Sequence, residues 1–407
     1  KENIAPANIS FLEAMILAAE RKYSAAIVSF ERAKTLDKNL VPTADYQIGL
    51  CFLNDKKFKS ARERFKATAS YDPQSDLATY ARQYMDAVEN TLFYTRPLRV
   101  TLGISGGYDS NVTSKPRHES VAGGAGNPET GVFSPSVRLE FVPQLESNWL
   151  FNAMFYSTAN FNQNYVHSRD SVSSTFSVIP GYNFGRFSIS MLGSYTNYLL
   201  RTDPDTTPDG NANLKHYEDY FTFGPIFKML LTEKQIVELF AGYDKKNYYN
   251  QAFTSNDNLR DAEGVRAYLS WVWFFLDNGF INLRYEVANE AANGSYWDNT
   301  CNRFSANLVL PLLPADYIQK IGFVYLQLAG SYTLQDYSHP QPYSELDGSA
   351  KTDKRKDDIY NGSASLNWDI TKNWSCFLQY AHTKTDSNIP AYEYTRNLYL
   401  AGLEFKF

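Results

Sequence analysis

The sequence predicts a two-part α+β multidomain fold, in which α-helical hairpins precede a 14-stranded antiparallel transmembrane β-barrel. Three observations predict it. The hydrophobic pattern changes from a helical period to a period of two near residue 96. Most period-two segments exceed the length of about 5–6 residues that is common for soluble strands. The final segment ends on an aromatic residue, Phe407. We therefore expect a helical domain at residues 1–95 and a barrel at residues 96–407.

The composition fits a membrane barrel and excludes other classes. The 407 residues include 30 Tyr, 27 Phe and 6 Trp, and such aromatic residues are typical of the interfacial belts of barrels. The net charge of -5 gives no reason to expect a nucleic-acid partner. No stretch of about 18 apolar residues occurs, which excludes a helical membrane protein. Because no export signal precedes Lys1, we expect the sequence to be that of a mature protein or a fragment.

The helical part carries an internal repeat. Small and aromatic residues recur 35 positions apart, so the residues expected to pack within and between the units are Ala14, Ala26, Phe30, Gly49, Ala61 and Phe65. This pattern resembles tetratricopeptide repeats, whose period is about 34 residues. The resemblance implies a concave surface that binds a peptide or protein. A third stretch, near residues 77–93, is expected to be an incomplete repeat or a cap. An unrelated bundle of four or five helices is the alternative.

Fourteen period-two segments follow, and most are long enough to cross a bilayer at a tilt, for which about 9–11 residues suffice. They lie near residues 97–108, 132–142, 148–161, 171–184, 186–199, 217–229, 234–248, 259–275, 278–289, 301–313, 318–336, 357–369, 373–386 and 396–407.

The connections between these segments favour a membrane barrel over a soluble sandwich. Short and long connections alternate, as periplasmic turns and extracellular loops do in outer-membrane barrels. The expected short turns are 143–147, 185, 230–233, 276–277, 314–317 and 371–372. An even number of strands places both ends of the barrel on the short-turn side, which predicts a periplasmic helical domain in a protein of the bacterial outer membrane.

The last strand alternates apolar and polar residues. A strand that closes with a C-terminal aromatic residue is typical of outer-membrane barrels, where it carries the assembly signal, although a soluble sheet can end in the same way. The expected signal residues are Tyr399, Leu403, Phe405 and Phe407. They imply outer-membrane lipids and the barrel-assembly machinery as partners.

The polar faces of the strands supply candidates for the interior of the barrel. Charged residues in this position form either a polar conduit, or a wall in contact with a client, or ion pairs between strands that hold the shape of the barrel. The candidates are Arg138, Glu140, Glu238, Asp244, Arg284, Glu286, Glu404 and Lys406.

Other polar motifs have simpler interpretations. The tripeptide Asp-Ser-Asn occurs at 109–111 and 386–388, where local turn hydrogen bonds are the expected role and a rim site is the alternative. The charge run at 349–358 is expected to be a solvated loop, or a contact for lipopolysaccharide phosphates. Four of the five histidines, at 118, 167, 216 and 339, fall in expected outer loops without metal-ligand spacing.

No motif for catalysis, metal binding or a cofactor emerges. The cysteines Cys51, Cys301 and Cys376 form no CxxC pair and indicate neither a zinc site nor a disulfide framework. No nucleophile elbow or phosphate loop occurs. We therefore expect a protein that is not an enzyme and holds no cofactor.

The two ends of the barrel segment resemble a known family. Tyr108–Val112 (YDSNV), Trp368, Trp374 and the run Ser387–Asn397 (SNIPAYEYTRN) before the closing Phe407 resemble the barrel of surface lipoprotein assembly modifiers, the Slam family. The resemblance implies a translocator that moves lipoproteins or small secreted proteins to the cell surface, with the periplasmic repeats receiving the client. Two alternatives remain: a polysaccharide-export porin, and a structural barrel that anchors a protein complex.

Overall fold

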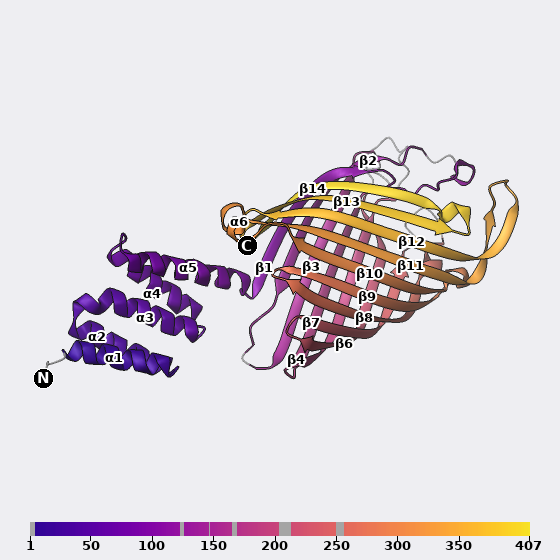
Figure 1. The fold of residues 1–407 in the computed structure, drawn as a ribbon. Coiled ribbons are helices and arrows are strands. Elements are labelled where there is room, and N and C mark those ends of the chain that lie inside the picture. The colour runs from indigo at the N-terminus through magenta and orange to yellow at the C-terminus, as the bar shows by residue number, and fades with distance from the viewer. Residues whose placement is uncertain (1–4, 123–125, 146, 165–168, 203–212, 250–255) are drawn as a thin grey trace. The chain divides into compact units, whose positions relative to one another are not determined.

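The computed structural model describes residues 5–122, 126–145, 147–164, 169–202, 213–249 and 256–407. The chain divides into two compact units, Lys1–Arg96 and Pro97–Phe407 (Figure 1). The first unit is helical and the second is a closed barrel. No helix among the described residues has the length and apolarity needed to span a membrane.

The helical unit consists of helices that pack consecutively, each on the next. Its α-helices are α1 (Pro6–Ala19), α2 (Tyr23–Leu36), α3 (Val41–Asn54), α4 (Phe58–Tyr71) and α5 (Asp76–Tyr94), with a short 3-10 turn, η1 (Lys38–Leu40), before α3.

The 35-residue repeat of the sequence is also a repeat of local geometry. Arg21 and Lys56, which lie 35 residues apart, both have positive φ (61° and 57°) and close the turns after α1 and α3. Asp37 and Asp72 are related by the same shift. Each side chain accepts a hydrogen bond from the backbone two residues later, at 2.9 and 3.2 Å. The hairpins α1–α2 and α3–α4 are therefore two copies of one unit.

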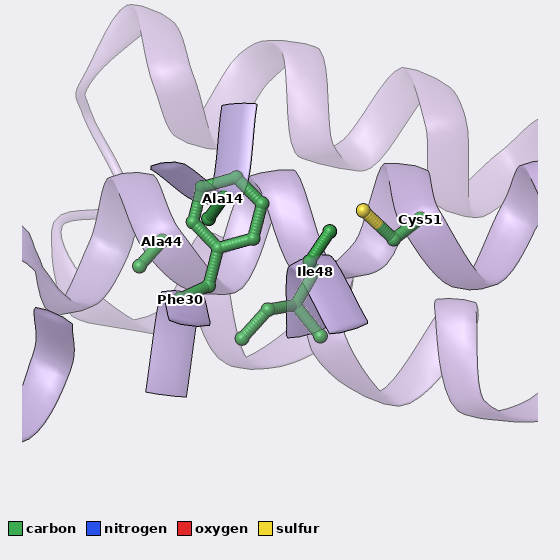
Figure 2. Packing of buried hydrophobic residues seen from close by; sticks show 6 residues of the cluster. Ala14, Phe30, Ala44, Ile48 and Cys51 are labelled. Atoms are coloured by element: carbon green, nitrogen blue, oxygen red, sulfur yellow. The ribbon is translucent and has the colours of Figure 1, made fainter. Parts of the chain in front are cut away.

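Small residues let the helices of this unit approach closely. The six expected packing residues are all buried. A Cβ atom on Gly49 would lie 2.7 Å from the ring of Phe65, so the ring packs directly on the backbone of α3. The first core cluster joins α1, α2 and α3 through Ala14, Ala26, Phe30, Ala44, Ile48 and Cys51 (Figure 2).

Cys51 is expected to resist alkylation in the folded protein. Its side chain is 2% exposed, and burial raises the pKa of the thiol to about 11, so the reactive thiolate is scarce at neutral pH. Mass spectrometry after maleimide treatment at pH 8 is expected to find Cys51 unmodified in buffer and modified in urea. Modification at equal rates in both conditions would contradict this packing.

The barrel is built from antiparallel strands in sequential order, and β1 pairs with β14 to close it. The strands are β1 (Leu98–Asp109), β2 (Thr130–Phe141), β3 (Trp149–Asn162), β4 (Ser171–Asn183), β5 (Phe187–Leu200), β6 (Lys215–Thr232), β7 (Gln235–Tyr248), β8 (Ala262–Leu276), β9 (Gly279–Ala292), β10 (Asn299–Pro311), β11 (Phe323–Ser344), β12 (Ala350–Asp369), β13 (Trp374–Ser387) and β14 (Tyr394–Lys406). Each of the fourteen predicted segments overlaps one of these strands.

Two details of the prediction are wrong. The turn after β10 is not short, because helix α6 (Ala315–Ile321) occupies it and β11 starts at Phe323 instead of 318. The expected loop 337–356 is mostly strand, because β11 and β12 continue to Ser344 and from Ala350. Connections therefore alternate in length except at 312–322, which is longer than the neighbouring connections 293–298 and 345–349.

The two ends of the barrel take their names from these connections. We call the end with connections 142–148, 184–186, 233–234, 277–278, 312–322 and 370–373 the turn end, and the opposite end the loop end. Strand β1, which follows the helical unit in the chain, begins at the turn end. Strand β14 ends there.

Candidate functional site

The strands separate an apolar face from a polar face throughout the barrel. Strand side chains alternate between two faces, and the register of each pair continues these faces around the sheet. One face carries large exposed apolar side chains such as Leu378 (60% exposed) and Val265 (63% exposed). Polar residues from β8 to β13 line one cavity of about 630 Å³. A cavity shared by six successive strands lies on their concave side, so the polar face is the interior.

Aromatic residues form two belts on the outer surface. The belt at the loop end is made of tyrosines: Tyr108, Tyr195, Tyr243, Tyr285, Tyr332, Tyr360, Tyr380 and Tyr399. The belt at the turn end includes Trp149, Tyr182, Phe184, Phe187, Trp271, Trp273, Trp368, Trp374, Phe405 and Phe407. Five tyrosine hydroxyls of the first belt donate to polar side chains nearer the loop end, for example Tyr332 to Asp358 at 2.9 Å and Tyr380 to Asn397 at 2.9 Å. Apolar rings with hydroxyls turned toward one polar edge are the arrangement that a lipid–water interface favours.

A charged wall lines the interior between β6 and β10. Glu286 on β9 lies at its centre and is 7% exposed. Its carboxylate pairs with Arg284 on the same strand, lies 3.8 Å from Arg266 on β8 and lies 3.7 Å from Arg303 on β10. Arg266 also pairs with Asp244 on β7 at 2.8 Å. These ion pairs cross four strands and join three arginines to two carboxylates.

Tyr268 on β8 extends the charged wall toward the turn end. The guanidinium of Arg284 lies 3.5 Å from its ring centre. Its hydroxyl donates to Glu238 at 2.7 Å, and Glu238 pairs with Lys228 on β6 at 3.0 Å.

Hydroxyl and amide groups line other stretches of the interior. Ser134 donates to Asn160 at 2.7 Å between β2 and β3, and Thr175 and Thr196 are 2.8 Å apart between β4 and β5. On β10 and β11, Gln327 donates to Asn307 at 3.1 Å. We call these uncharged polar stretches the hydroxyl wall. Charged pairs also line the interior outside the charged wall, on β1, β2, β12 and β14.

All eight interior candidates lie at register positions on the polar face, but only four come together. Glu238, Asp244, Arg284 and Glu286 belong to the charged wall. On β2, Glu140 pairs with Arg99 at 3.0 Å, and Arg138 lies 5.4 Å from the ring centre of Tyr156. On β14, Glu404 accepts from Ser375 at 3.4 Å and Lys406 pairs with Asp369 at 2.9 Å.

Sequence reasoning missed the partners that complete these pairs. Lys228, Arg266 and Arg303 were not among the candidates, although each occupies a polar position in an alternating segment. The alternation of apolar and polar residues along each strand could have identified them, as it identified Arg284 between Leu283 and Tyr285. Their pairing could not have been identified, because it depends on the register between strands.

The seam between β1 and β14 is fixed at both ends. At the turn end, Phe407 and Val100 exchange backbone hydrogen bonds of 2.9 and 2.8 Å. At the loop end, Arg396 forms a bidentate pair with Asp109, which is 2% exposed. Tyr399, Leu403 and Phe405 lie on the outward face of β14, and the ring of Phe407, directly after the strand, lies 5.6 Å from that of Phe405.

Both Asp-Ser-Asn tripeptides join their strand ends to a neighbouring strand. At 109–111, Asn111 makes the expected local bond to Asp109 (2.9 Å) but also donates to the backbone of Thr395 on β14 at 2.9 Å. At 386–388, Asn388 accepts from and donates to the backbone of β12 at 2.7 and 2.8 Å. Turn formation is therefore only part of their role.

Removing the carboxylate at the seam is expected to destabilise the barrel. Asp109→Asn abolishes a charged bidentate bond at a buried position, where such bonds contribute about 1.5–3 kcal/mol. The midpoint of heat-induced unfolding in detergent, read from gel mobility, is expected to fall. Asp336→Asn is the matched control, because that carboxylate is 59% exposed and 3.8 Å from Lys356. Equal shifts in both variants would contradict a special role for the seam pair.

The charge run at 349–358 lies almost wholly in strand β12 and not in a loop. Lys351, Asp353, Lys354 and Lys356 are exposed, as expected of a solvated face, but Arg355 and Asp357 are buried. Arg355, 9% exposed, pairs with Asp357. Three rings surround its guanidinium, namely Tyr392 at 3.4 Å, Tyr337 at 4.5 Å and Trp297 at 5.8 Å. This cluster joins β11 and β12 to the connections after β9 and β13. It ties the loop end together by cation–π contacts.

The described histidines have separate partners. His118 contacts Glu393 at 3.1 Å, His216 contacts Asp219 at 2.9 Å, and His339 lies 3.3 Å from Asp298. His382 lies in β13 and contacts Asn397, and His167 lies outside the described residues. Among the described residues, no three His, Cys, Asp or Glu side chains gather in a group that would hold a metal ion.

Comparisons with known proteins find only remote similarity. No family model matches the sequence, and no curated protein matches it. Solved structures with a similar arrangement include CdiB from Acinetobacter baumannii, with a TM-score of 0.44 and 7% identity over 77% of this chain and 60% of that chain. The chain thus spans about 60% of the length of that structure. An anion-selective porin from Comamonas acidovorans has a TM-score of 0.39 and 9% identity over 76% of this chain and 98% of that chain.

Proposed function

We propose that this chain is a bacterial outer-membrane translocator that moves a lipoprotein or small protein client to the cell surface, with the helical unit in the periplasm receiving the client. The observation that carries the proposal is the apolar outer surface between two aromatic belts, around a polar interior. From Tyr399 to Phe407 the belts are eight residues apart on β14. At about 3.3 Å per residue and a tilt of about 40°, this separation spans roughly 20 Å along the membrane normal. That height is near the apolar thickness of outer-membrane barrels.

The interior supports transport in preference to a purely structural role. Its ion pairs are satisfied within the wall, and its hydroxyl and amide groups exchange partners readily with water or with a passing chain. A polar chain therefore meets a surface that wets it, and each carboxylate of the charged wall is already paired with an arginine or a lysine.

The helical unit supports a protein client. Helix α1 exposes a stripe of apolar residues at helical spacing, Ile9, Leu12 and Ile16, which are 55%, 55% and 61% exposed. Such a stripe on one helix face is typical of a surface that binds another chain. The resemblance to tetratricopeptide repeats and to the Slam family agrees with this role. The helical unit joins the barrel at the turn end, which faces the periplasm in outer-membrane barrels.

Surface proteolysis of lipoproteins in a deletion strain tests the proposal. We expect at least one lipoprotein to become protected from external protease while remaining lipidated and cell-associated. Complementation with Leu12→Glu/Ile16→Glu is expected to fail, whereas Val28→Glu, at an exposed site on α2 (69% exposed), is expected to restore exposure. Unchanged exposure of every lipoprotein in the deletion strain would overturn the proposal.

Polysaccharide export is the second candidate, and the hydroxyl wall favours it. Serine, threonine and asparagine side chains are suitable partners for sugar hydroxyls. Loss of surface polymer in the deletion strain, with lipoprotein exposure unchanged, would select this function instead.

A further inference from the structure

The interior cavity of about 630 Å³ beside the charged wall has two unlike halves. One half is formed by β8, β9 and β10, where Arg266, Arg284 and Arg303 line it together with Glu286. The other half is formed by β11, β12 and β13, and its side chains carry hydroxyl or amide groups: Ser331, Asn361, Ser363, Gln379 and Thr383. The volume lies in the range of ligand pockets, which is about 300–1,000 Å³.

The arginines of this cavity exceed the carboxylates that pair with them by one. All three arginines share Glu286, and Asp244 pairs with Arg266 at 2.8 Å. Toward the turn end, the carboxylate of Glu238 has its own cation, because it pairs with Lys228 at 3.0 Å. That pair is neutral and leaves the balance of the cavity unchanged.

The interior carboxylates nearer the loop end also have cations of their own. Glu290 pairs with Lys246, and both Lys246 and Arg260 act electrostatically on Glu218. Because this group joins two carboxylates to two cations, it does not neutralise the arginines of the cavity. One positive charge therefore remains there.

Arg303 is the arginine most open to the cavity. Its side chain is 49% exposed, against 21% for Arg266 and 33% for Arg284. Its Nε donates to Thr333 at 3.2 Å, and its Nη1 lies 3.7 Å from Glu286, which is longer than a hydrogen bond. In the part of the chain that the structure describes, neither Nη1 nor Nη2 of Arg303 donates a hydrogen bond. Both nitrogens can therefore donate to one ligand.

We propose that this cavity binds a carboxylate carried by a polypeptide segment, with Arg303 as its principal contact. The inference rests on the proposed function, because it takes the moving chain to be protein. A guanidinium with two open donors matches the two oxygens of a carboxylate. An excess of one positive charge matches a monoanion better than a phosphate dianion. The hydroxyl and amide groups of β11 to β13 can bond to the adjoining peptide backbone.

Calorimetry with the full chain in detergent tests this inference with two probes, hexaglutamate and hexaglutamine. We expect hexaglutamate to bind saturably, and more weakly as salt is added. Hexaglutamine is expected to bind about tenfold or more weakly, the loss that one charge-assisted contact implies. Arg303→Gln is expected to weaken hexaglutamate binding by about the same factor. Glu286→Gln is expected to strengthen it by about threefold or more, because the excess charge of the cavity rises.

Arg138→Gln is the matched control. Arg138 also lies on the inner face, with its guanidinium 5.4 Å from the ring centre of Tyr156, but its strand β2 is not among the strands that line this cavity. The variant lowers the charge of the barrel by the same amount as Arg303→Gln. Hexaglutamate binding is expected to stay within about twofold, because salt screens distant charges. Gel mobility before and after heating verifies that each variant is folded.

The possible outcomes separate this inference from the proposed function. Hexaglutamate binding that is absent, or that Arg303→Gln leaves unchanged, would overturn the carboxylate site while the proteolysis test of function stands. Equal losses in Arg303→Gln and Arg138→Gln would also overturn it, because the attraction would then be nonspecific. Binding of an oligogalacturonate of equal charge, without binding of hexaglutamate, would overturn it in favour of a glycan. Loss of binding in Arg303→Gln, with the control unaffected, would support it.

Discussion

Phe65→Ala is expected to unfold the helical unit while the barrel stays intact. Phe65 is fully buried. Its ring stacks on Tyr84 at 5.4 Å and packs against the backbone of Gly49. Replacing a buried phenylalanine by alanine costs about 3–5 kcal/mol, because transfer energy is lost and a cavity remains. This cost is a large fraction of the stability of a small domain.

Two measurements on the full chain in detergent distinguish unfolding of the helical unit from unfolding of the barrel. Limited proteolysis is expected to degrade residues before Pro97 in the variant, whereas the heat-modified gel mobility of the barrel is expected to stay normal. Val28→Ala is the control, since that side chain is 69% exposed and its loss is expected to change stability by less than about 0.5 kcal/mol. Equal protease resistance of Phe65→Ala and the parent chain would contradict the described packing of α3, α4 and α5.

Leu378→Arg is expected to impair the insertion and stability of the barrel. Leu378 lies on the outward face of β13 between the two belts and is 60% exposed. An arginine on the lipid face of a barrel costs about 2–4 kcal/mol near the bilayer centre. Unfolding titrations in lipid vesicles are expected to show this loss.

The adjacent residue provides the matched control for that substitution. Gln379 belongs to the inward face, so Gln379→Arg places the same charge in the polar interior and is expected to change stability by less than about 1 kcal/mol. A soluble protein would tolerate the first substitution, at an exposed surface site, at least as well as the second. The reverse order of stability would therefore contradict a lipid-facing surface.

The strands were predictable because their alternation is long and regular. The two errors, at the β11–β12 hairpin and at helix α6, have local causes. Pro340 and Pro342 in β11 lack the backbone donor that a central strand needs, which made residues 337–344 read as a loop. They are tolerated because the β11–β12 hairpin continues beyond the ends of its neighbours and its register shifts between Asp336 and Pro340. Helix α6 was missed because a single short helix carries too few turns for its period to be visible.

For the candidate site, the sequence predicted only which face of each strand its residues occupy. Alternation placed Glu286 and Arg284 on the polar side, but the pairing of Glu286 with Arg303 of β10 follows from register, which the sequence does not encode locally. The burial of Arg355 was unpredictable for a related reason. Its aromatic partners, such as Trp297 and Tyr392, come from connections distant in sequence.

A spin-label scan along β14 in lipid nanodiscs tests the central claim most directly. Single cysteines at positions 398 to 405, with Cys51, Cys301 and Cys376 replaced, report the access of each label to oxygen in lipid and to a water-soluble nickel complex. We predict a period of two, in which labels at 399, 401, 403 and 405 contact lipid and labels at 398, 400, 402 and 404 contact water. Labels that contact water on both faces, or a helical period of accessibility, would contradict a barrel with an apolar exterior and a polar interior.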